Sequence, residues 1–401
     1  MIGGLSVLLA GTIVVRPAGP ISTLTAALAR ASPNDTIVVE AGTYREPTIV
    51  VGLRVMILGH NQPIFDGGGD HTVFRVLADS VTIDGLLIRN VGPTSTEDRA
   101  AIRLEGTRGC VIRHNEIRDT FFGIYAAKAH GCRIEGNTVV GSGRTDAESG
   151  NAIHLWSSDG MSIIDNRVRG HRDGIYFEFV KASRIEGNES RGNRRYGLHF
   201  MFSDSCTYRR NVFRENGAGV AVMYTKRVTM TENRFEHNKG QAAYGLLLKD
   251  ITDSRIDSNY FDHNTIGLYL EGSDHVTVRA NQFDANGWAL RVLANATENL
   301  FEHNTFTGNA FDVSTNSRSA SSTFRENFWD HYRGFDLDRD GIGDVPFRPV
   351  RLFSLVVGQS APALILLRST FVDLLDAAER LLPILTPEAL VDPRPLMAAP
   401  R

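Results

Sequence analysis

The chain has 401 residues, of which 42% are hydrophobic and 22% charged, a balance typical of a protein that buries a core. The formal net charge is -3 and there is no long basic run, which argues against a nucleic-acid partner. The three cysteines allow at most one disulfide, and no apolar run reaches the ~18 residues that a membrane-spanning helix needs.

The N-terminal residues combine two features. Met1–Gly11 is apolar and ends in small residues, as the core of a secretory signal does, but it lacks the charged segment that normally precedes such a core. Residues 1–15 are therefore either the remnant of an export signal or a first buried strand. Ser22–Ala31 predicts a short amphipathic helix before a strand at Thr36–Glu40. Since a repeat structure must cover its terminal unit, we expect residues 16–100 to hold an N-terminal cap and the first coils.

The dominant signal is an internal repeat over residues 101–330. An apolar residue, two others and an asparagine recur every 22 to 29 residues, and the marking asparagines are Asn115, Asn137, Asn166, Asn188, Asn211, Asn233, Asn259, Asn281, Asn304 and Asn327. Short alternating strands led by glycine, such as Gly174-Ile-Tyr, lie between them. A period near 22 fits one coil of a β-helix, whose strands pair with the coils above and below at ~4.8 Å per rung.

The turn residues and the handedness rule complete the fold prediction. Asparagine and glycine tolerate the left-handed backbone of sharp corners, and stacked asparagines can hydrogen-bond along the axis as a ladder. Parallel crossovers are almost always right-handed. The sequence therefore predicts an all-β protein, a right-handed parallel β-helix with a short N-terminal cap, a C-terminal amphipathic helix and an extended tail.

One outward face of the coils carries an unusual set of side chains. Alternation along the glycine-led strands separates inward from outward columns, and the outward columns hold His154, Glu178, His199, Met201 and Met223, with Trp156 and Tyr176 beside them. Thioether and neutral imidazole groups are ligands for copper, above all Cu(I). Two interpretations stay open: these residues contact copper, or they form a docking face for another protein.

The cysteines give a weaker signal. Cys110 and Cys132 are expected on adjacent rungs, where ~4.8 Å between Cα atoms would permit a disulfide. Two small buried side chains stacked in the core are the alternative, and the sequence does not decide between them.

An acidic loop follows the last coil, over residues 331–350. Its carboxylates occur at every second position around a glycine, as in the first half of a calcium loop, at Asp336, Asp338, Asp340 and Asp344. The glutamate that ends such a loop is missing, so Asp344 would have to replace it. The alternative is an acidic, solvated turn.

The C-terminal segment, residues 351–401, is expected to dock on a partner or to cap the last coil. Pro362–Leu382 predicts one helix, with proline at its start and Pro383 after its end. Its apolar stripe includes Leu364, Leu367, Phe371, Leu374 and Leu375. The following Leu385–Met397 is rich in proline and is expected to be extended.

Several sequence segments together resemble the NosD family of periplasmic accessory proteins for nitrous oxide reductase maturation. They are NAIHLWSSD (151–159), GIYFEFV (174–180), RYGLHFMFSD (195–204), GVAVMYT (219–225), FWDHYRGFDLDRDGIGDVPFRPV (328–350) and APALILLRSTFVDLLDAAERLLP (361–383). The resemblance extends from about Arg16 to Leu390.

The resemblance implies a β-helix of the kind shared with carbohydrate-binding proteins, and a binding component rather than an enzyme. It implies a periplasmic location, attached to the inner membrane through a permease with a cytoplasmic ATPase. There the protein would assist delivery of copper, or of sulfur, to the copper–sulfide centre of nitrous oxide reductase, with a copper-chaperone lipoprotein as a further partner. It does not settle which residues touch copper.

The main rival is a carbohydrate-active enzyme, a polysaccharide lyase, epimerase or glycosidase. A glycosidase needs a pair of outward carboxylates flanking the sugar. Glu178 has no second carboxylate beside it in the outward columns, so the sequence favours the binding protein.

Overall fold

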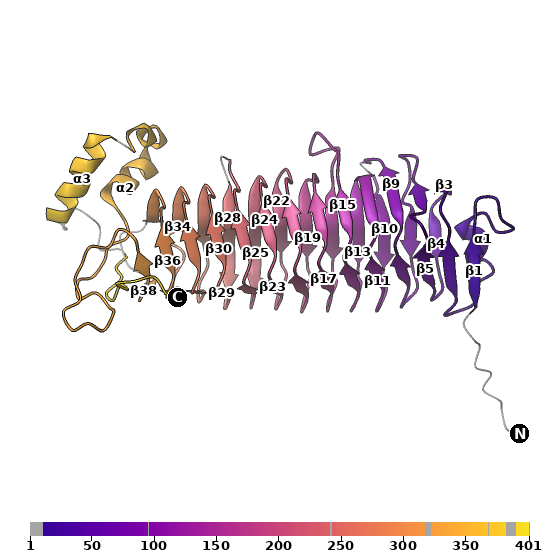
Figure 1. Ribbon diagram of the computed structural model, residues 1–401, viewed down its shortest axis with the longest axis horizontal. Coiled ribbons are helices and arrows are strands. Elements are labelled where there is room, and N and C mark those ends of the chain that lie inside the picture. The colour runs from indigo at the N-terminus through magenta and orange to yellow at the C-terminus, as the bar shows by residue number, and fades with distance from the viewer. Residues whose placement is uncertain are drawn as a thin grey trace, which may run out of the picture. The chain divides into compact units, whose positions relative to one another are not determined.

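The chain folds into coils of a right-handed parallel β-solenoid, about 13 turns in all, followed by a short C-terminal helical segment. The computed structural model describes residues 11–94, 96–240, 243–316, 322–367, 369–381 and 390–400. The described residues divide between Glu189 and Ser190 into two compact units, and each unit is described by itself (Figure 1). The predicted fold class is confirmed.

In the first unit each coil gives one strand to each of three parallel sheets, A, B and C. Sheet A holds β1 (Thr12–Val15), β2 (Thr36–Val39), β5 (Met56–Gly59), β8 (Thr82–Asp84), β11 (Val111–Arg113), β14 (Arg133–Glu135), β17 (Ser162–Ile164) and β20 (Arg184–Glu186). Sheet B holds β3 (Thr43–Tyr44), β6 (Ile64–Asp66), β9 (Leu87–Val91), β12 (Glu116–Thr120), β15 (Thr138–Val140) and β18 (Arg167–Arg169). Sheet C holds β4 (Ile49–Val51), β7 (Phe74–Val76), β10 (Ala100–Glu105), β13 (Phe122–Ala127), β16 (Asn151–Trp156) and β19 (Asp173–Glu178).

The second unit repeats this arrangement. Its sheet A strands are β23 (Thr207–Arg209), β26 (Thr229–Thr231), β29 (Arg255–Asp257), β32 (Thr277–Arg279), β35 (Leu300–Glu302) and β38 (Thr323–Arg325). Its sheet B strands are β21 (Glu189–Arg191), β24 (Val212–Arg214), β27 (Arg234–Glu236), β30 (Tyr260–Asp262), β33 (Gln282–Asp284), β36 (Thr305–Thr307) and β39 (Phe328–Trp329). Its sheet C strands are β22 (Tyr196–Met201), β25 (Ala218–Lys226), β28 (Tyr244–Thr252), β31 (Ile266–Glu271), β34 (Trp288–Val292) and β37 (Phe311–Ser314).

The core consists of columns of like side chains in register. In the first unit Ile112 pairs with Ile134, which pairs with Ile163, and all three are fully buried. In the second unit a column of rings fills the inner side of sheet B, with centroids 4.1–5.6 Å apart, from Phe213 through Phe235, Phe261, Phe283 and Phe306 to Trp329. Strict register places the same residue type at the same depth in each coil, so the repeated sequence builds one continuous core.

Asparagine ladders fix the corners of the coils. In the first unit the side-chain oxygen of Asn137 accepts hydrogen bonds from both the backbone N–H and the Nδ2 of Asn115, each at 3.0 Å. The residue before each ladder asparagine has a left-handed backbone, as at His114 (φ 52°). The predicted ladder is therefore confirmed within each unit.

The second unit also has a ladder that the repeat analysis missed. It lies at the corner between sheets B and C and consists of Asn193, Asn216, Asn238, Asn264, Asn286 and Asn309. All six are buried. Their amides satisfy buried backbone carbonyls that a tight corner would otherwise leave without donors.

The N-terminal cap forms where it was expected. Helix α1 (Leu24–Leu28) begins after Thr23, whose hydroxyl accepts the N–H of Ala26, and it buries Leu24 against the first coils. The carboxylate of Glu46 accepts the N–H of Leu24 at 2.7 Å and thereby satisfies a second free donor of the first turn. Residues 1–10 of the expected export segment lie outside the described residues, and Thr12–Val15 forms β1.

The C-terminal segment differs from the single helix predicted over Pro362–Leu382. It folds as α2 (Leu352–Gln359), a 3₁₀ helix η1 (Ala361–Leu366) and α3 (Thr370–Leu381). Buried Phe353, Val357 and Val372 pack on Phe311 of the last sheet C strand. The chain bends to place both helices on that ring, so the predicted stripe does not form one packed face.

The end of the chain returns to the last coil. Leu396 makes parallel bridge contacts with Phe328 and antiparallel ones with Ile342, and Asp392 pairs with Phe347. The first part of the predicted extended tail, residues 385–389, lies outside the described residues. Among the described residues, no helix combines the length and the apolar character needed to cross a membrane.

Candidate functional site

The residues predicted to share an outward face fall into both units. In the first unit His154 pairs in register with Tyr125 on one side and Tyr176 on the other, while Trp156 pairs with Glu178. The columns expected from the sequence are thus confirmed there. His154 and Glu178 stand in neighbouring columns of the outer face of sheet C, two strand positions apart.

His154 is embedded among aromatic rings. Its ring centroid lies 4.5 Å from that of Tyr125, 4.7 Å from that of Tyr176 and 5.3 Å from that of Phe122. Burial lowers the pKa of His154 to about 3, so the imidazole is neutral in the physiological range. Burial likewise raises the pKa of Tyr125 to about 12.

The hydrogen bonding of His154 limits its use as a ligand. The side-chain amide nitrogen of Asn151 lies 3.0 Å from its Nδ1. Because an amide nitrogen only donates, Nδ1 accepts and the ring proton lies on Nε2, which is buried and makes no hydrogen bond. His154 would have to give up this bond before it could bind a metal.

In the second unit the two predicted thioethers lie together. Met201 on β22 pairs in register with Met223 on β25, and both are half-buried. His199 pairs with Ala221, is buried, and places its ring 4.7 Å from that of Tyr196. The next coil brings Lys249 beside Met223, and Lys249 forms an ion pair with Glu271 at 3.2 Å, so the apolar character of the face ends there.

Two exposed rings follow the two methionines in the chain. Phe202 and Tyr224 stack at 5.2 Å with nearly parallel planes, and more than two-fifths of each residue is open to solvent. Both residues have a left-handed backbone, with φ values of 49° and 55°. Met201, Met223, Phe202 and Tyr224, which we call the thioether face, together form a partly exposed apolar surface with soft sulfur donors.

The cysteines are free thiols in the core. Cys110, Cys132 and Cys206 are all buried, and the N–H of Cys110 donates to the sulfur of Cys132 at 3.3 Å. The neighbouring Cys132 and burial raise the pKa of the Cys110 thiol. The alternative of stacked small side chains therefore describes this structure, and the disulfide is not formed.

The acidic loop brings together three of its four predicted carboxylates. Asp336, Asp338 and Asp340 each place a carboxylate oxygen within 4.8 Å of the others. Asp344 is used differently, since its Oδ2 accepts the N–H of Leu337 at 2.7 Å. Asp336 accepts the N–H groups of Arg339 and Gly341 at 2.6 and 2.9 Å. Carboxylate oxygens suit Ca²⁺, which stays a prediction for this loop.

A carboxylate–imidazole cluster with one buried carboxylate was not predicted from the sequence. His331 Nδ1 lies 2.8 Å from Asp330 and 3.4 Å from Asp312, whose carboxylate is buried. Hydrogen bonds to Asp312 and Asp330 raise the pKa of His331 to about 9. Burial raises the pKa of Asp312. No sequence signal marks this cluster, because Asp312 and His331 come from different coils.

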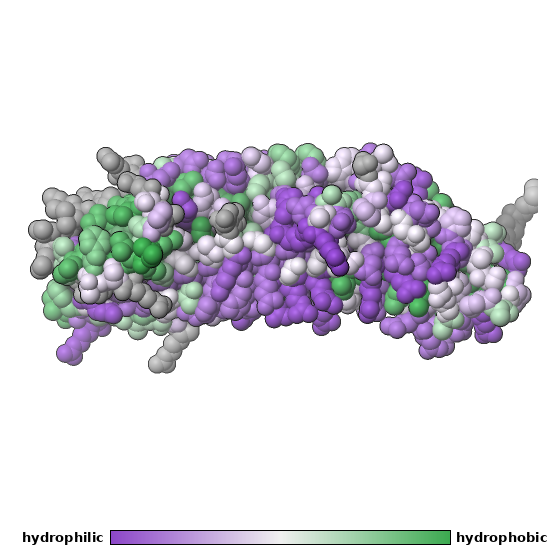
Figure 2. Space-filling model, turned by 90° about the horizontal axis from the view of Figure 1, so that it is seen from above, coloured by the Kyte–Doolittle hydropathy of each residue, from purple (hydrophilic) through white to green (hydrophobic). Residues whose placement is uncertain are grey.

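The C-terminal helical segment presents most of its predicted stripe to solvent. Figure 2 shows hydrophobic residues gathered over this segment, and the exposed ones include Val356, Leu364, Ile365, Leu366, Phe371 and Leu374. Leu367 instead packs against the cluster of Phe311 and Phe353, and Leu375 is half-buried. An exposed apolar patch of this kind is typical of a protein–protein contact.

Comparison with known proteins identifies relatives along most of the chain. A family model described as "Periplasmic copper-binding protein (NosD)" matches residues 141–334, which include both methionines of the thioether face. A relative from Pseudomonas aeruginosa, named "Probable ABC transporter binding protein NosD", is 28% identical over 84% of this chain and 82% of its own. A relative of the same name from Stutzerimonas stutzeri is 27% identical over 84% and 81%.

Similar solved structures share the fold. An α-1,3-glucanase catalytic unit from Streptomyces thermodiastaticus aligns with a TM-score of 0.60 at 15% identity over 82% of this chain and 70% of its own. The A-module of the mannuronan C-5 epimerase AlgE6 from Azotobacter vinelandii gives 0.52 at 14% over 73% and 89%. The surface adhesin PfbA of Streptococcus pneumoniae gives 0.56 at 12% over 81% and 91%. Enzymes and an adhesin share this architecture, so the fold alone does not decide the function.

The sequence relatives, unlike these structures, are named as binding proteins and align along most of their own length. These matches support assignment of the chain to the NosD family.

Proposed function

We propose that this protein is the periplasmic binding component of an ABC-type transporter, which assists delivery of copper, or of sulfur, to the copper–sulfide centre of nitrous oxide reductase. The observation that carries the proposal is the in-register pairing of Met201 and Met223 beside the exposed rings of Phe202 and Tyr224. A solvent-facing β-sheet usually carries polar side chains, so paired thioethers next to exposed rings indicate a binding surface.

Soft donors point to copper in its reduced form. Thioether sulfur prefers Cu(I) over the hard cations and binds it weakly enough to release it. Two methionines on adjacent rungs, ~4.8 Å apart at their Cα atoms, can approach one ion from the same side. In this proposal copper is a transient cargo, received from a copper-chaperone lipoprotein that docks on the stacked rings and passed on to nitrous oxide reductase.

The C-terminal helical segment is proposed to bind the membrane permease, whose cytoplasmic ATPase would drive the cycle. Its exposed side chains, above all Phe371 and Leu374, are not used by the solenoid. The match to relatives named as ABC transporter binding proteins supports this assignment. Attachment of the protein to the inner membrane would follow from this contact.

A carbohydrate-active enzyme is less well supported by the site. Two carboxylates on the sheet C strands are bound to cations: Glu105 to Arg75 and Arg103, and Glu271 to Lys249. A glycosidase or an epimerase needs free, converging groups at the sugar. The likeness to the epimerase and the glucanase reflects the shared solenoid.

The test separates copper contact from protein docking. Met201→Leu with Met223→Leu removes both sulfurs but nearly conserves volume and apolar character. Anaerobic Cu(I) titration against a chromogenic chelator should show that the double variant loses one Cu(I) equivalent, while Met56→Leu, an exposed methionine of sheet A, keeps it. Unchanged Cu(I) uptake in the double variant would remove the metal role of this face.

Docking is tested with the stacked rings. Phe202→Ser with Tyr224→Ser should weaken binding of the copper-chaperone lipoprotein without changing the thermal midpoint, because both rings are exposed. The methionine double variant should bind the lipoprotein as the native protein does. Equal binding by the ring variant would contradict the docking role.

A further inference from the structure

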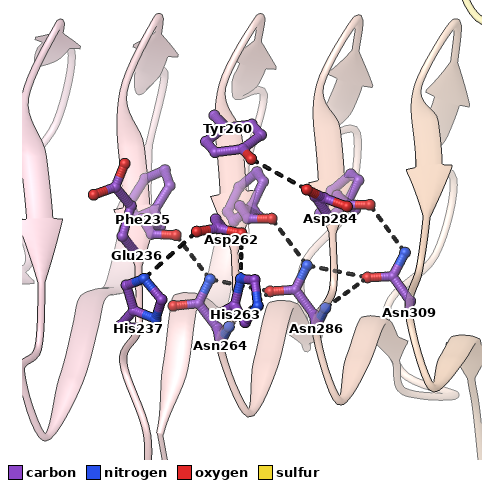
Figure 3. Close-up of polar contacts among 12 residues, drawn as sticks. Phe235, Glu236, His237, Tyr260, Asp262, His263, Asn264, Asp284, Asn286 and Asn309 are labelled. Carbon is purple, nitrogen blue, oxygen red and sulfur yellow. Dashed lines mark hydrogen bonds and ion pairs between the residues drawn. The ribbon is translucent and has the colours of Figure 1, made fainter.

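Two histidines of the second unit stand one above the other at the end of sheet B. His237 follows β27 and His263 follows β30, and their ring centroids lie 5.1 Å apart (Figure 3). Asp262, the last residue of β30, lies between them: its carboxylate is 2.5 Å from His263 Nδ1 and 3.7 Å from His237 Nε2. Two imidazoles and one carboxylate therefore converge from adjacent coils.

The backbone under both histidines is held by the asparagine ladder. Each histidine has a left-handed backbone, with φ values of 54° and 52°, and each directly precedes a buried ladder asparagine, Asn238 or Asn264. The Nδ2 of Asn264 donates to the carbonyl of Phe235 at 2.8 Å and to Asn286 at 3.1 Å (Figure 3). The N–H of His237 donates to the carbonyl of Asp262 at 2.9 Å. The Cα positions of the group are therefore fixed before any ligand binds.

The chemistry of the three possible ligand atoms determines which metal ions fit this group. Each of the three side chains offers one ligand atom, and the three atoms lie within 4.8 Å of one another. Two imidazole nitrogens and one carboxylate oxygen suit Zn²⁺, Cu²⁺ or Ni²⁺, whereas Ca²⁺ and Mg²⁺ prefer oxygen alone. About half of each imidazole side chain is open to solvent, so an ion can enter and water can complete its coordination.

The surrounding charges leave Asp262 available to a cation. The neighbouring Glu236 is neutralised by Arg234, whose Nε lies 2.5 Å from its carboxylate. Asp284, on the next coil, accepts the hydroxyl of Tyr260 at 3.3 Å and adds a further negative charge on the same side (Figure 3). The local field therefore favours a divalent ion over a neutral or anionic ligand.

We propose that His237, Asp262 and His263 form a binding site for one divalent transition-metal ion, with Cu²⁺ or Zn²⁺ as the ligand class. The site is separate from the thioether face in position and in donor chemistry, because nitrogen and oxygen donors favour a divalent ion over Cu(I). It does not depend on the transport role proposed above.

Another histidine at a corner of a coil, His303, shows which features are particular to the pair His237 and His263. His303 also precedes a ladder asparagine, Asn304, and has the same left-handed backbone (φ 54°). Its Nε2 lies 3.5 Å from a single carboxylate, that of Glu326. A second imidazole does not stack on it, because the equivalent position of the next coil is Glu326 itself. His303 is therefore a matched control with one imidazole and one carboxylate.

The experiment titrates metal-free, full-length protein with Cu²⁺ and separately with Zn²⁺, following heat by calorimetry and the Cu²⁺ nitrogen hyperfine pattern by electron paramagnetic resonance. His237→Asn and His263→Asn are suitable variants, since asparagine tolerates a left-handed backbone. Loss of an outer-shell partner alone weakens metal binding ~10- to 100-fold, so loss of a ligand should weaken it at least as much.

The native protein and His303→Asn should bind one Cu²⁺ with the pattern of two nitrogens, and either site variant should lose that pattern. Far-UV circular dichroism checks that the variants are folded. The proposal is overturned if folded His237→Asn and His263→Asn keep the native affinity, or if His303→Asn loses as much. A Cu(I) titration of the same variants should be unchanged, which distinguishes failure of this site from failure of the thioether face.

Discussion

The carboxylate of Asp392 accepts two hydrogen bonds from Asn327, one from its backbone N–H and one from its Nδ2, both at 3.0 Å. The Nε1–H of Trp329 donates to the same oxygen at 3.1 Å. Along the ladder each asparagine donates in this way to the next, as Asn304 does to Asn327. The sequence holds no asparagine after Asn327, so Asp392 takes the position of the missing rung and terminates the ladder.

Replacement of Asp392 should therefore destabilise the last coil. Asp392→Ala leaves three buried donors without their acceptor, and we expect a loss of about 2–4 kcal/mol in the free energy of unfolding. Asp392→Asn keeps one carbonyl oxygen and should lose less. Urea unfolding followed by far-UV circular dichroism measures the change, and Arg394→Ala, an exposed neighbour, serves as the control. Equal stability of Asp392→Ala and Arg394→Ala would show that the ladder does not need this termination.

The ring column of sheet B should dominate the stability of the second unit. Phe261 is fully buried between Phe235 and Phe283, with ring centroids 4.7 and 4.6 Å away. Phe261→Ala leaves a cavity that neighbours on both sides cannot fill, at a cost of about 3–5 kcal/mol. Phe335→Ala removes the same side chain from an exposed position and should cost under ~0.5 kcal/mol. Similar urea midpoints for the two variants would contradict a continuous core.

The repeat made the solenoid predictable, because the asparagines and the alternating strands recur in sequence and in space with one period. Local sequence was also sufficient for α1, whose capping threonine and apolar face are adjacent in the chain. The register of Met201 with Met223 followed from the same period. The solenoid and this register depend on residues that are one coil apart, and most coils have 22 or 23 residues.

The features that the sequence did not predict depend on contacts between residues whose separation in the chain does not follow the repeat. The single helix expected over Pro362–Leu382 is broken because Phe353 and Val372 both pack on Phe311, a contact that helical periodicity does not contain. Asp392 reaches Asn327 over 65 residues. The pair His237 and His263 could have been noticed, since each lies four residues after a marking asparagine of the repeat, Asn233 or Asn259.

The pH dependence of stability should carry a contribution from His331. Hydrogen bonds to Asp312 and Asp330 raise its pKa to about 9, above the ~6.5 of an unfolded histidine. A raised pKa stabilises the fold fully below about pH 6.5, and this contribution is lost as the pH rises through about 9. The thermal midpoint of the native protein should therefore fall from pH 7 to pH 10 more steeply than that of His331→Gln. Parallel pH profiles for the two proteins would show that His331 is not protonated in the fold.

His154 should affect the pH dependence of stability in the direction opposite to that of His331. Burial lowers its pKa to about 3, so the folded protein resists the protonation that an unfolded histidine undergoes near pH 6.5. Its contribution to stability is present above about pH 6.5 and is lost as the pH falls toward 3. In the NMR spectrum the C2 proton of His154 should therefore show no titration between pH 5 and 8. A midpoint near 6.5 for His154 would contradict its burial among the rings.

The exposed side of α3 should matter for partner binding and not for folding. Phe371 and Leu374 are 52% and 70% exposed, whereas Val372 between them is buried against Phe311 and Phe353. Phe371→Ser with Leu374→Ser should leave the thermal midpoint within about 2 °C of the native value, because exposed positions contribute little to the core. The same variant should recover less permease when the complex is purified from membranes. Val372→Ser should instead lower the thermal midpoint, since it buries a hydroxyl in the apolar cluster. If the exposed double variant recovers the permease as fully as the native protein, another surface makes the contact, and the apolar stripe needs a different partner.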